Sequence, residues 1–428
     1  MSVAVVLPGG GARGAYEVGA LSVLLPALEA RGEQVSIWCG TSVGAINAAC
    51  YASLAQLSAR EQCEGLVERW SELRKGDVVA PIVGLGGTRM ILRLIGRAVR
   101  CPGAGSAGLL DPTPLASSLD SWIDWDEIEA NVRARRIAAV CVVATLLSAG
   151  RSVGFVATAA SPPNRVDDEI RYVRTRLRGE HVRASAAIPM LFPTVRVESP
   201  RIAAGHYTDG GTRLNSPIKP ALDLGADKVI LIGLEPFARG GRRTAASPRA
   251  PSLSSVAANV LDGLLVDQVA QDLRRLATIN SFFAESYATG TIDGSRSYQL
   301  ARGHAPYRPI SYALVSPRRH GEIGRLAEET FRRRYGGFRA VKDVDFALIA
   351  RILGAEGRQR GEFLSFLLFD RHFITELIEL GRRDAHLWLR RHPRFWCRDA
   401  EHDLAFGALD RRRVLEQHAI DEFRALAR

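Results

Sequence analysis

The sequence predicts an α/β fold in which helices cover both faces of a mostly parallel sheet, followed by a helical extension. Continuously apolar strands alternate with helices from the start of the chain, as in parallel sheets that are buried on both faces. The 428 residues suffice for one large α/β domain plus an appendage. Beyond Pro317 the pattern becomes helical and contains no strand-like segment.

Two strand–turn–helix units open the chain. In order, we expect a strand at Val3–Leu7, a glycine turn at Gly9–Gly14, a helix at Ala15–Leu25, a strand at Val35–Cys39 and a helix at Val43–Leu57. Pro26 is expected to interrupt or restart the first helix, because proline lacks the N–H that a helix interior needs.

Further strands are expected after an inserted region. They are Ile137–Ala144, Ser152–Ala157, Ile202–His206, Lys228–Leu234 and Ile310–Val315. Glycines and prolines punctuate Pro81–Pro114, which suggests a cap or lid over the carboxyl edge of the sheet. Arg, Gly, Ser, Ala and Pro dominate residues 237–255, a composition typical of a mobile surface loop.

We therefore divide the chain into a main domain at residues 1–318, with an insert at residues 60–115, and a helical extension at residues 319–428. Apolar residues recur at helical spacing in the extension, and we expect them to pack on the main domain. They are Phe363, Phe366, Leu367, Ile374, Leu377 and Ile378. An amphipathic helix on a membrane surface is the alternative interpretation.

The net charge of +11 comes almost entirely from arginine, since lysine occurs at only four positions. The arginines are scattered and match no zinc-finger or RNA-recognition pattern, so we expect no nucleic-acid partner. A basic face would favour anionic lipid head groups, which leaves peripheral membrane contact open. The sequence carries no signal for an oligomeric state.

The same composition bears on compartment and metal binding. The longest apolar run, Ile137–Leu147, is far shorter than the roughly 20 residues of a membrane-spanning helix. No basic segment of a secretory signal precedes the first strand. The six cysteines show no CxxC spacing, so we predict reduced core cysteines, a cytoplasmic protein and no metal site.

The first motif is a GxGxxG, Gly9-Gly10-Gly11-Ala12-Arg13-Gly14, between a strand and a helix. Such a turn can hold the pyrophosphate of a dinucleotide at the helix N-terminus. That use calls for an acidic residue at the end of the second strand, where this chain has Cys39-Gly40-Thr41. The same geometry can instead present backbone N–H groups to an oxyanion.

The second motif is a GxSxG, Gly40-Thr41-Ser42-Val43-Gly44, between a buried strand and a helix. This is the context of a nucleophile elbow, a sharp turn that projects the serine hydroxyl outward. The helix N-terminus that follows would favour negative charge near the serine. A serine that only caps an ordinary helix is the alternative.

The third motif, Asp209-Gly210-Gly211, follows a short strand. Taken alone, an aspartate beside two glycines favours an Asx-turn. A serine nucleophile needs a base, however, and this carboxylate stands where a strand leaves the sheet. We therefore predict that Asp209 partners Ser42.

Together these motifs resemble a known family. In their order, the three signatures are similar to those of the patatin-like phospholipases: Gly9–Gly14, Gly40–Gly44 and Asp209–Gly211. Three further family-like segments are Ala184–Pro193, Asn215-Ser216-Pro217 and Leu224-Gly225-Ala226-Asp227. The resemblance spans about residues 3–320 and weakens in the insert, in the loop at 237–255 and in the C-terminal helices.

The resemblance implies a three-layer α/β/α hydrolase of lipid acyl esters, of the phospholipase A or lysophospholipase type, with a lipid or phospholipid substrate and no cofactor. Ser42 would be the nucleophile and Asp209 its general base. Main-chain amides of Gly9–Gly14, chiefly Gly10 and Gly11, would form the oxyanion hole. The remaining motif residues would shape the elbow (Gly40, Thr41, Val43 and Gly44) and the turn after the base (Gly210 and Gly211).

A Ser–Asp–His triad is the competing arrangement, in which a histidine follows the aspartate. His304 fits this order best, because it lies in a loop before an expected strand, whereas His206 precedes Asp209. We expect all nine histidines to be structural or on the surface. A nucleotide-binding oxidoreductase that uses Gly9–Gly14 and a catalytically silent lipid-binding protein are the alternative functions.

Overall fold

The computed structural model describes residues 1–80, 108, 110–163, 170–189, 191–236, 310–335 and 358–397. Most of the predicted lid at Pro81–Pro114 and the whole predicted loop at 237–255 lie outside these ranges. His304 and Cys101 lie outside them as well.

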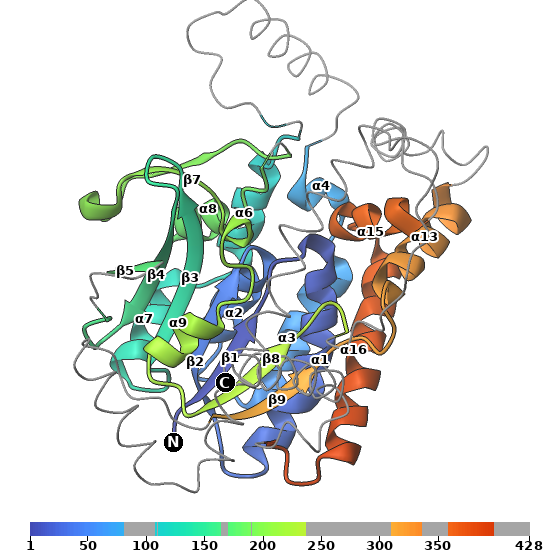
Figure 1. Ribbon diagram of the computed structural model, residues 1–428, viewed down its shortest axis with the longest axis horizontal. Coiled ribbons are helices and arrows are strands. Elements are labelled where there is room, and N and C mark those ends of the chain that lie inside the picture. Colours follow the sequence, from blue (N-terminus) through green and yellow to red (C-terminus); the bar gives the residue numbers. More distant parts are fainter. Residues whose placement is uncertain are drawn as a thin grey trace, which may run out of the picture.

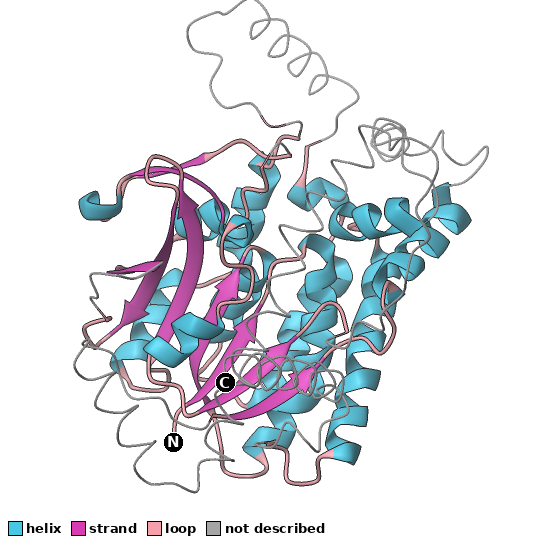
Figure 2. Ribbon diagram, in the orientation of Figure 1, coloured by secondary structure: helices cyan, strands magenta, loops and turns pink. Residues whose placement is uncertain are grey.

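One sheet joins all the described strands (Figure 2). They are β1 (Val3–Leu7), β2 (Val35–Thr41), β3 (Ala139–Leu146), β4 (Arg151–Thr158), β5 (Ile170–Arg174), β6 (Val195–Val197), β7 (Gly205–Asp209), β8 (Lys228–Ile232) and β9 (Ser311–Val315). The order across the sheet is β5-β4-β3-β2-β1-β8-β9, and β7 pairs with both β3 and β6. The pairs from β3 through β2, β1 and β8 to β9 are parallel, as the sequence predicts.

Helices cover both faces of this sheet (Figure 1). The helices are α1 (Gly14–Glu29), α2 (Val43–Ser53), α3 (Ala59–Glu72), α4 (Lys75–Val78), α6 (Thr113–Trp122), α7 (Trp125–Arg133), α8 (Gly179–Ser185), α9 (Ile218–Asp223), α13 (Glu322–Tyr335), α15 (Arg358–Leu367) and α16 (Arg371–Arg391). α2 packs on β1, β2 and β3, and α9 packs on β1 and β2.

The structure differs from the prediction at the first helix. α1 continues through Pro26 to Glu29 rather than stopping there. Pro26 lies near the C-terminal end of α1, so it removes only one interior hydrogen bond. Its neighbours Leu24, Leu25 and Leu28 are buried, and this apolar packing outweighs the missing bond. α2, in contrast, ends four residues earlier than predicted.

The strand predicted at Ile202–His206 is also wrong in its first half. Arg201–Ala203 form a 3-10 turn, and β7 begins at Gly205. The Ile202 side chain is 67% exposed, so its apolar character does not mark a position in the sheet. The structure adds two strands that the sequence analysis did not predict, β5 and β6.

The C-terminal helices pack on the sheet domain, and α16 runs along α1 (Figure 1). The predicted apolar stripe is confirmed, because all six of its residues are buried. It lies on two helices, α15 and α16, which meet at a short turn. Inside the contact between α16 and α1, the Tyr16 hydroxyl donates a hydrogen bond of 3.1 Å to the Asp384 carboxylate.

The cysteines that the structure describes lie in the core. Cys39, Cys50, Cys63, Cys141 and Cys397 are buried and unpaired by disulfides. Within the described ranges, no helix has both the length and the apolar character that crossing a bilayer requires.

Candidate active site

The parallel pairing of β1 with β2 brings the first two motifs together. Leu7 lies opposite Gly40 in the register, so both strands end at the same edge of the sheet. The glycine turn and the serine turn therefore leave the sheet side by side. A Cβ atom added to Gly9 would lie only 2.9 Å from the Cβ of Ser42.

Ser42 occupies a strained turn. Its φ of 55° and ψ of −124° are costly for any residue with a side chain, and such strain is concentrated at functional sites. The turn also needs small flanking residues. A Cβ at Gly40 would come within 2.2 Å of the Gly44 carbonyl oxygen, and one at Gly44 within 2.2 Å of the Leu7 carbonyl oxygen. These are the dimensions of the sharp elbow that the GxSxG motif predicts.

Ser185 supports this turn from α8. The Ser42 N–H donates to Ser185 Oγ at 2.8 Å, and that hydroxyl donates to the Val143 carbonyl oxygen at 2.6 Å. Ser185 therefore ties the serine turn to β3. Ser185 belongs to the family-like segment Ala184–Pro193, which is the only signal for it in the sequence and predicts no role for it.

Asp209 ends β7, where its backbone pairs with Ala144 of β3. Its N–H donates to the Ala187 carbonyl oxygen at 2.8 Å, and its Oδ1 accepts from the Gly211 N–H at 2.7 Å. This second contact is the Asx-turn that the sequence also favoured. The other oxygen, Oδ2, is buried and has no hydrogen-bond partner in the described part of the chain.

Burial raises the pKa of Asp209 from its ordinary value of 3.8 to about 7, while the Ser42 hydroxyl and the Gly211 N–H act in the opposite direction. Ser42 is thus close enough to influence Asp209, yet the two side chains do not form a hydrogen bond of good geometry. Catalytic hydrogen bonds are often long in the absence of substrate. An aspartate with this pKa can exchange a proton near neutral pH.

The glycine turn has both used and unused backbone donors. The Gly9 N–H donates to Asn215 Oδ1 at 2.9 Å, and the N–H groups of Arg13 and Gly14 donate to carbonyl oxygens within the turn. Three of the six N–H groups in Gly9–Gly14 thus already have acceptors, and the oxyanion role of the turn stays a prediction. The N–H groups of Gly10, Gly11 and Ala12 have no acceptor among the described residues.

Arg13, although it belongs to the glycine turn, is not exposed to solvent. Its side chain is fully buried, and one terminal nitrogen lies 2.8 Å from the Glu362 carboxylate of α15. This contact between residues 349 positions apart has no signal in the sequence motifs.

Two of the described histidines show the kind of contacts that engage them away from the serine turn. His181 accepts from the Arg178 N–H and donates to the Ser199 carbonyl oxygen, and burial lowers its pKa. His320 lies 2.8 Å from the Glu235 carboxylate. None of the histidines that the structure describes hydrogen-bonds to Ser42 or Asp209.

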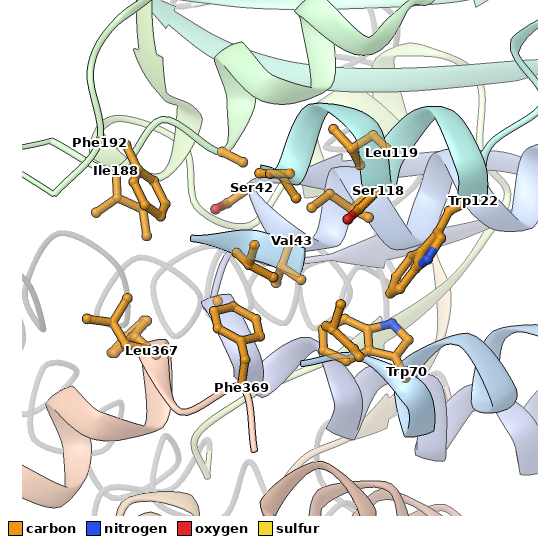
Figure 3. A pocket seen from close by; sticks show the side chains of 17 residues that line it. Ser42, Val43, Trp70, Ser118, Leu119, Trp122, Ile188, Phe192, Leu367 and Phe369 are labelled. Atoms are coloured by element: carbon orange, nitrogen blue, oxygen red, sulfur yellow. The ribbon is translucent and has the colours of Figure 1, made fainter. Parts of the chain in front are cut away.

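An apolar pocket opens beside Ser42 (Figure 3). It encloses about 610 Å³ of empty space, counting the part open to solvent, and lies between α2, α3, α6 and the end of α15. Trp70 and Trp122 meet edge to face in its wall, with ring centroids 6.1 Å apart. The Trp70 indole N–H donates to Asn47 Oδ1 at 2.9 Å, which fixes the ring. Phe369 lines the pocket from the C-terminal region.

This arrangement provides a serine in a strained turn, a carboxyl group of near-neutral pKa and unpaired N–H groups beside an apolar pocket. In the described ranges, no cluster of three or more His, Cys, Asp or Glu side chains could hold a metal ion. The chemistry available is nucleophilic attack with proton transfer to a carboxylate.

The comparison with protein families agrees with the sequence motifs. The model of the patatin-like phospholipase family matches residues 5–222. No curated protein matches the sequence. Among solved structures, the crystal structure of VipD from Legionella pneumophila aligns with 95% of this chain and 89% of its own, at 13% identity and a TM-score of 0.28.

Proposed function

Because the chain belongs to the patatin-like phospholipase family, we propose that it hydrolyses fatty acyl esters of lipids with Ser42 as the nucleophile and Asp209 as the general base. The main support for this proposal is the Oδ2 atom of Asp209. It is buried, has no hydrogen-bond partner among the described residues and lies near Ser42 in its strained turn. Family membership favours this function over a nucleotide-binding oxidoreductase. The proposed substrates are phospholipids or lysophospholipids, which the enzyme would meet at a membrane surface.

In the proposed reaction, Ser42 Oγ attacks the ester carbonyl carbon while its proton passes to Asp209 Oδ2. The carbonyl oxygen becomes an oxyanion, which the N–H groups of Gly10 and Gly11 would stabilise. The alcohol then leaves with the proton from Asp209. A water molecule gives a proton to the same carboxylate and attacks the acyl carbon, the bond to Ser42 Oγ breaks to release the fatty acid, and Asp209 returns the proton to Ser42 Oγ.

The pocket supports an acyl chain as the group that lies beside Ser42. Aromatic and aliphatic side chains from five helices (α2, α3, α4, α6 and α15) line it, which suits a hydrocarbon tail and would exclude a charged head group. The head group would then lie toward the solvent-open side. Binding of the acyl chain therefore requires no polar contact inside the pocket.

Replacing Ser42 by alanine tests the proposal directly. We expect Ser42→Ala to lower the hydrolysis of phospholipid and p-nitrophenyl acyl esters by at least about 1000-fold, because the nucleophile is lost. A fluorophosphonate should label the wild type at Ser42 and leave the variant unlabelled. The fold should persist, as judged by circular dichroism.

Two outcomes would contradict this proposal. Activity of Ser42→Ala within about tenfold of the wild type, a barrier change of only about 1.4 kcal/mol, would remove Ser42 from the reaction. Binding of phospholipid without hydrolysis or labelling by the wild type would instead favour the catalytically silent lipid-binding protein.

A further inference from the structure

We propose that Glu362 and Ser365 of α15 are positioning residues, which act through Arg13 to hold the glycine turn in the shape that hydrolysis requires. This inference rests on the proposed function, since it concerns the same oxyanion donors. Both residues lie well beyond the segment that matches the family model, which ends at residue 222.

The Arg13 side chain is the link between α15 and the glycine turn. Its Nε donates to Ser365 Oγ at 2.7 Å, and its Nη2 donates to both the carbonyl oxygen and the carboxylate of Glu362 at 2.9 and 2.8 Å. The guanidinium carbon lies 3.9 Å from the centroid of the Phe366 ring. A buried guanidinium with these contacts is fixed in direction as well as in charge.

A second contact joins α15 to Gly11, which lies two residues before Arg13 in the glycine turn. Gly11 has a φ of +58°, a left-handed conformation that glycine adopts at little cost. A Cβ atom added there would lie 2.2 Å from the Phe366 carbonyl oxygen, so the two backbones are already in close contact. The backbone of α15 therefore presses against the residue that carries a proposed oxyanion donor.

α15 is itself firmly anchored on its other side. α13 and α15 cross where Gly361 approaches Gly324, and the Glu362 side chain packs against the same Gly324. The Arg360 guanidinium forms a bidentate ion pair with Glu328 of α13. The backbone contact between Gly361 and Gly324 holds α15 on α13 independently of this ion pair, so α15 can serve as a fixed support for the turn without it.

Loss of the Glu362 carboxylate should affect kcat rather than KM. Without the Glu362 carboxylate, the buried Arg13 charge loses its counterion and the guanidinium must move. The glycine turn would shift with it, and donors that act mainly in the transition state would be misplaced. Such a change lowers kcat and leaves KM nearly unaltered.

The chain offers a matched control for this test. Glu362 and Glu328 are both mostly buried carboxylates in ion pairs that anchor α15, but only Glu362 reaches the glycine turn. We expect Glu362→Gln to lower kcat by about 10- to 100-fold, the loss typical of a small misplacement of catalytic groups. KM should stay within about twofold, and Glu328→Gln should leave kcat within about twofold.

The affinity for a transition-state analogue distinguishes misplaced oxyanion donors from a general loss of stability. The affinity for an alkyl trifluoromethyl ketone, whose adduct carries an oxyanion, should fall in Glu362→Gln in parallel with kcat. Ser365→Ala, which keeps the ion pair, should lower kcat less but in the same direction. Its kcat decides the test if Glu362→Gln does not fold.

Equal effects of Glu362→Gln and Glu328→Gln would overturn the inference, as would a rise in KM with kcat unchanged. Wild-type kcat in Ser365→Ala would overturn it where Glu362→Gln is unfolded. Failure of the proposed function is distinguishable, because wild type and Ser42→Ala would then hydrolyse esters equally.

Discussion

Asp209 combines a catalytic demand with a cost to stability. A base that works at neutral pH needs a pKa near 7, and burial supplies it by disfavouring the carboxylate. The same burial makes the charged form of the folded protein less stable. The pH dependence of hydrolysis and the pH dependence of stability can be measured separately.

We expect the hydrolysis rate to depend on the ionisation of Asp209. The base must be deprotonated to accept the Ser42 proton, so kcat/KM should fall as the pH drops below about 7. This acidic limb should persist in His206→Gln and His320→Gln. A histidine variant that moves or removes the limb would instead favour a triad.

Asp209→Asn should abolish hydrolysis and yet stabilise the protein at high pH. The folded protein holds the Asp209 proton up to about pH 7, whereas the unfolded chain releases it near 3.8. Stability from this group is therefore full below about pH 4 and is lost as the pH rises through 7. The loss is about 4 kcal/mol at pH 8. Thermal melts at pH 8 and pH 4 measure it.

The gain in Tm of Asp209→Asn over the wild type should be present at pH 8 and shrink toward pH 4. Equal gains at both values would show that the charge of Asp209 is not the cause. A loss at pH 8 would contradict the direction of the pKa shift itself.

At the scale of elements, α16 is held to α1 by a close helix crossing. A Cβ at Gly381 would lie 2.2 Å from the Tyr16 carbonyl oxygen, and one at Gly19 would lie 2.1 Å from that of Ile378. The crossing buries the hydrogen bond between Tyr16 and Asp384. The C-terminal helices are therefore packed tightly on α1, the helix that directly follows the glycine turn.

Alanine substitutions at two helical glycines should have opposite signs. Gly381→Ala should destabilise the protein by about 1–3 kcal/mol, because α16 must move away from α1. Gly65→Ala on α3 meets only an ordinary contact at 3.9 Å, so it should stabilise by up to about 1 kcal/mol through helix propensity. Urea unfolding measures both, and a stabilised Gly381→Ala would disprove the tight crossing.

How well the sequence predicted an element depended on its burial. β1 and β9 are continuously buried, and their apolar runs predicted their bounds closely. β5 lies at the edge of the sheet and contains two arginines among its five residues, and β6 has only three residues, so neither presents an apolar run. A partly exposed edge strand carries a weaker pattern than a central one.

At the scale of the whole molecule, motifs located the candidate site, but distant contacts complete it. Ser42 and Asp209 were predictable because each stands in a short local pattern at a strand end. Ser185, Asn215 and Glu362 were not assigned roles, since their partners lie 143, 206 and 349 positions away. Those contacts arise from packing that no local spacing encodes.

The ion pair between Arg13 and Glu362 has a consequence for synthesis. The chain leaves the ribosome from its N-terminus, so the glycine turn emerges long before its acceptor on α15. At about 5–20 residues per second, the 349 intervening positions take roughly 20–70 s to translate. During that interval the Arg13 guanidinium must remain in water. The nascent protein therefore acquires the final form of its glycine turn only after α15 has been made.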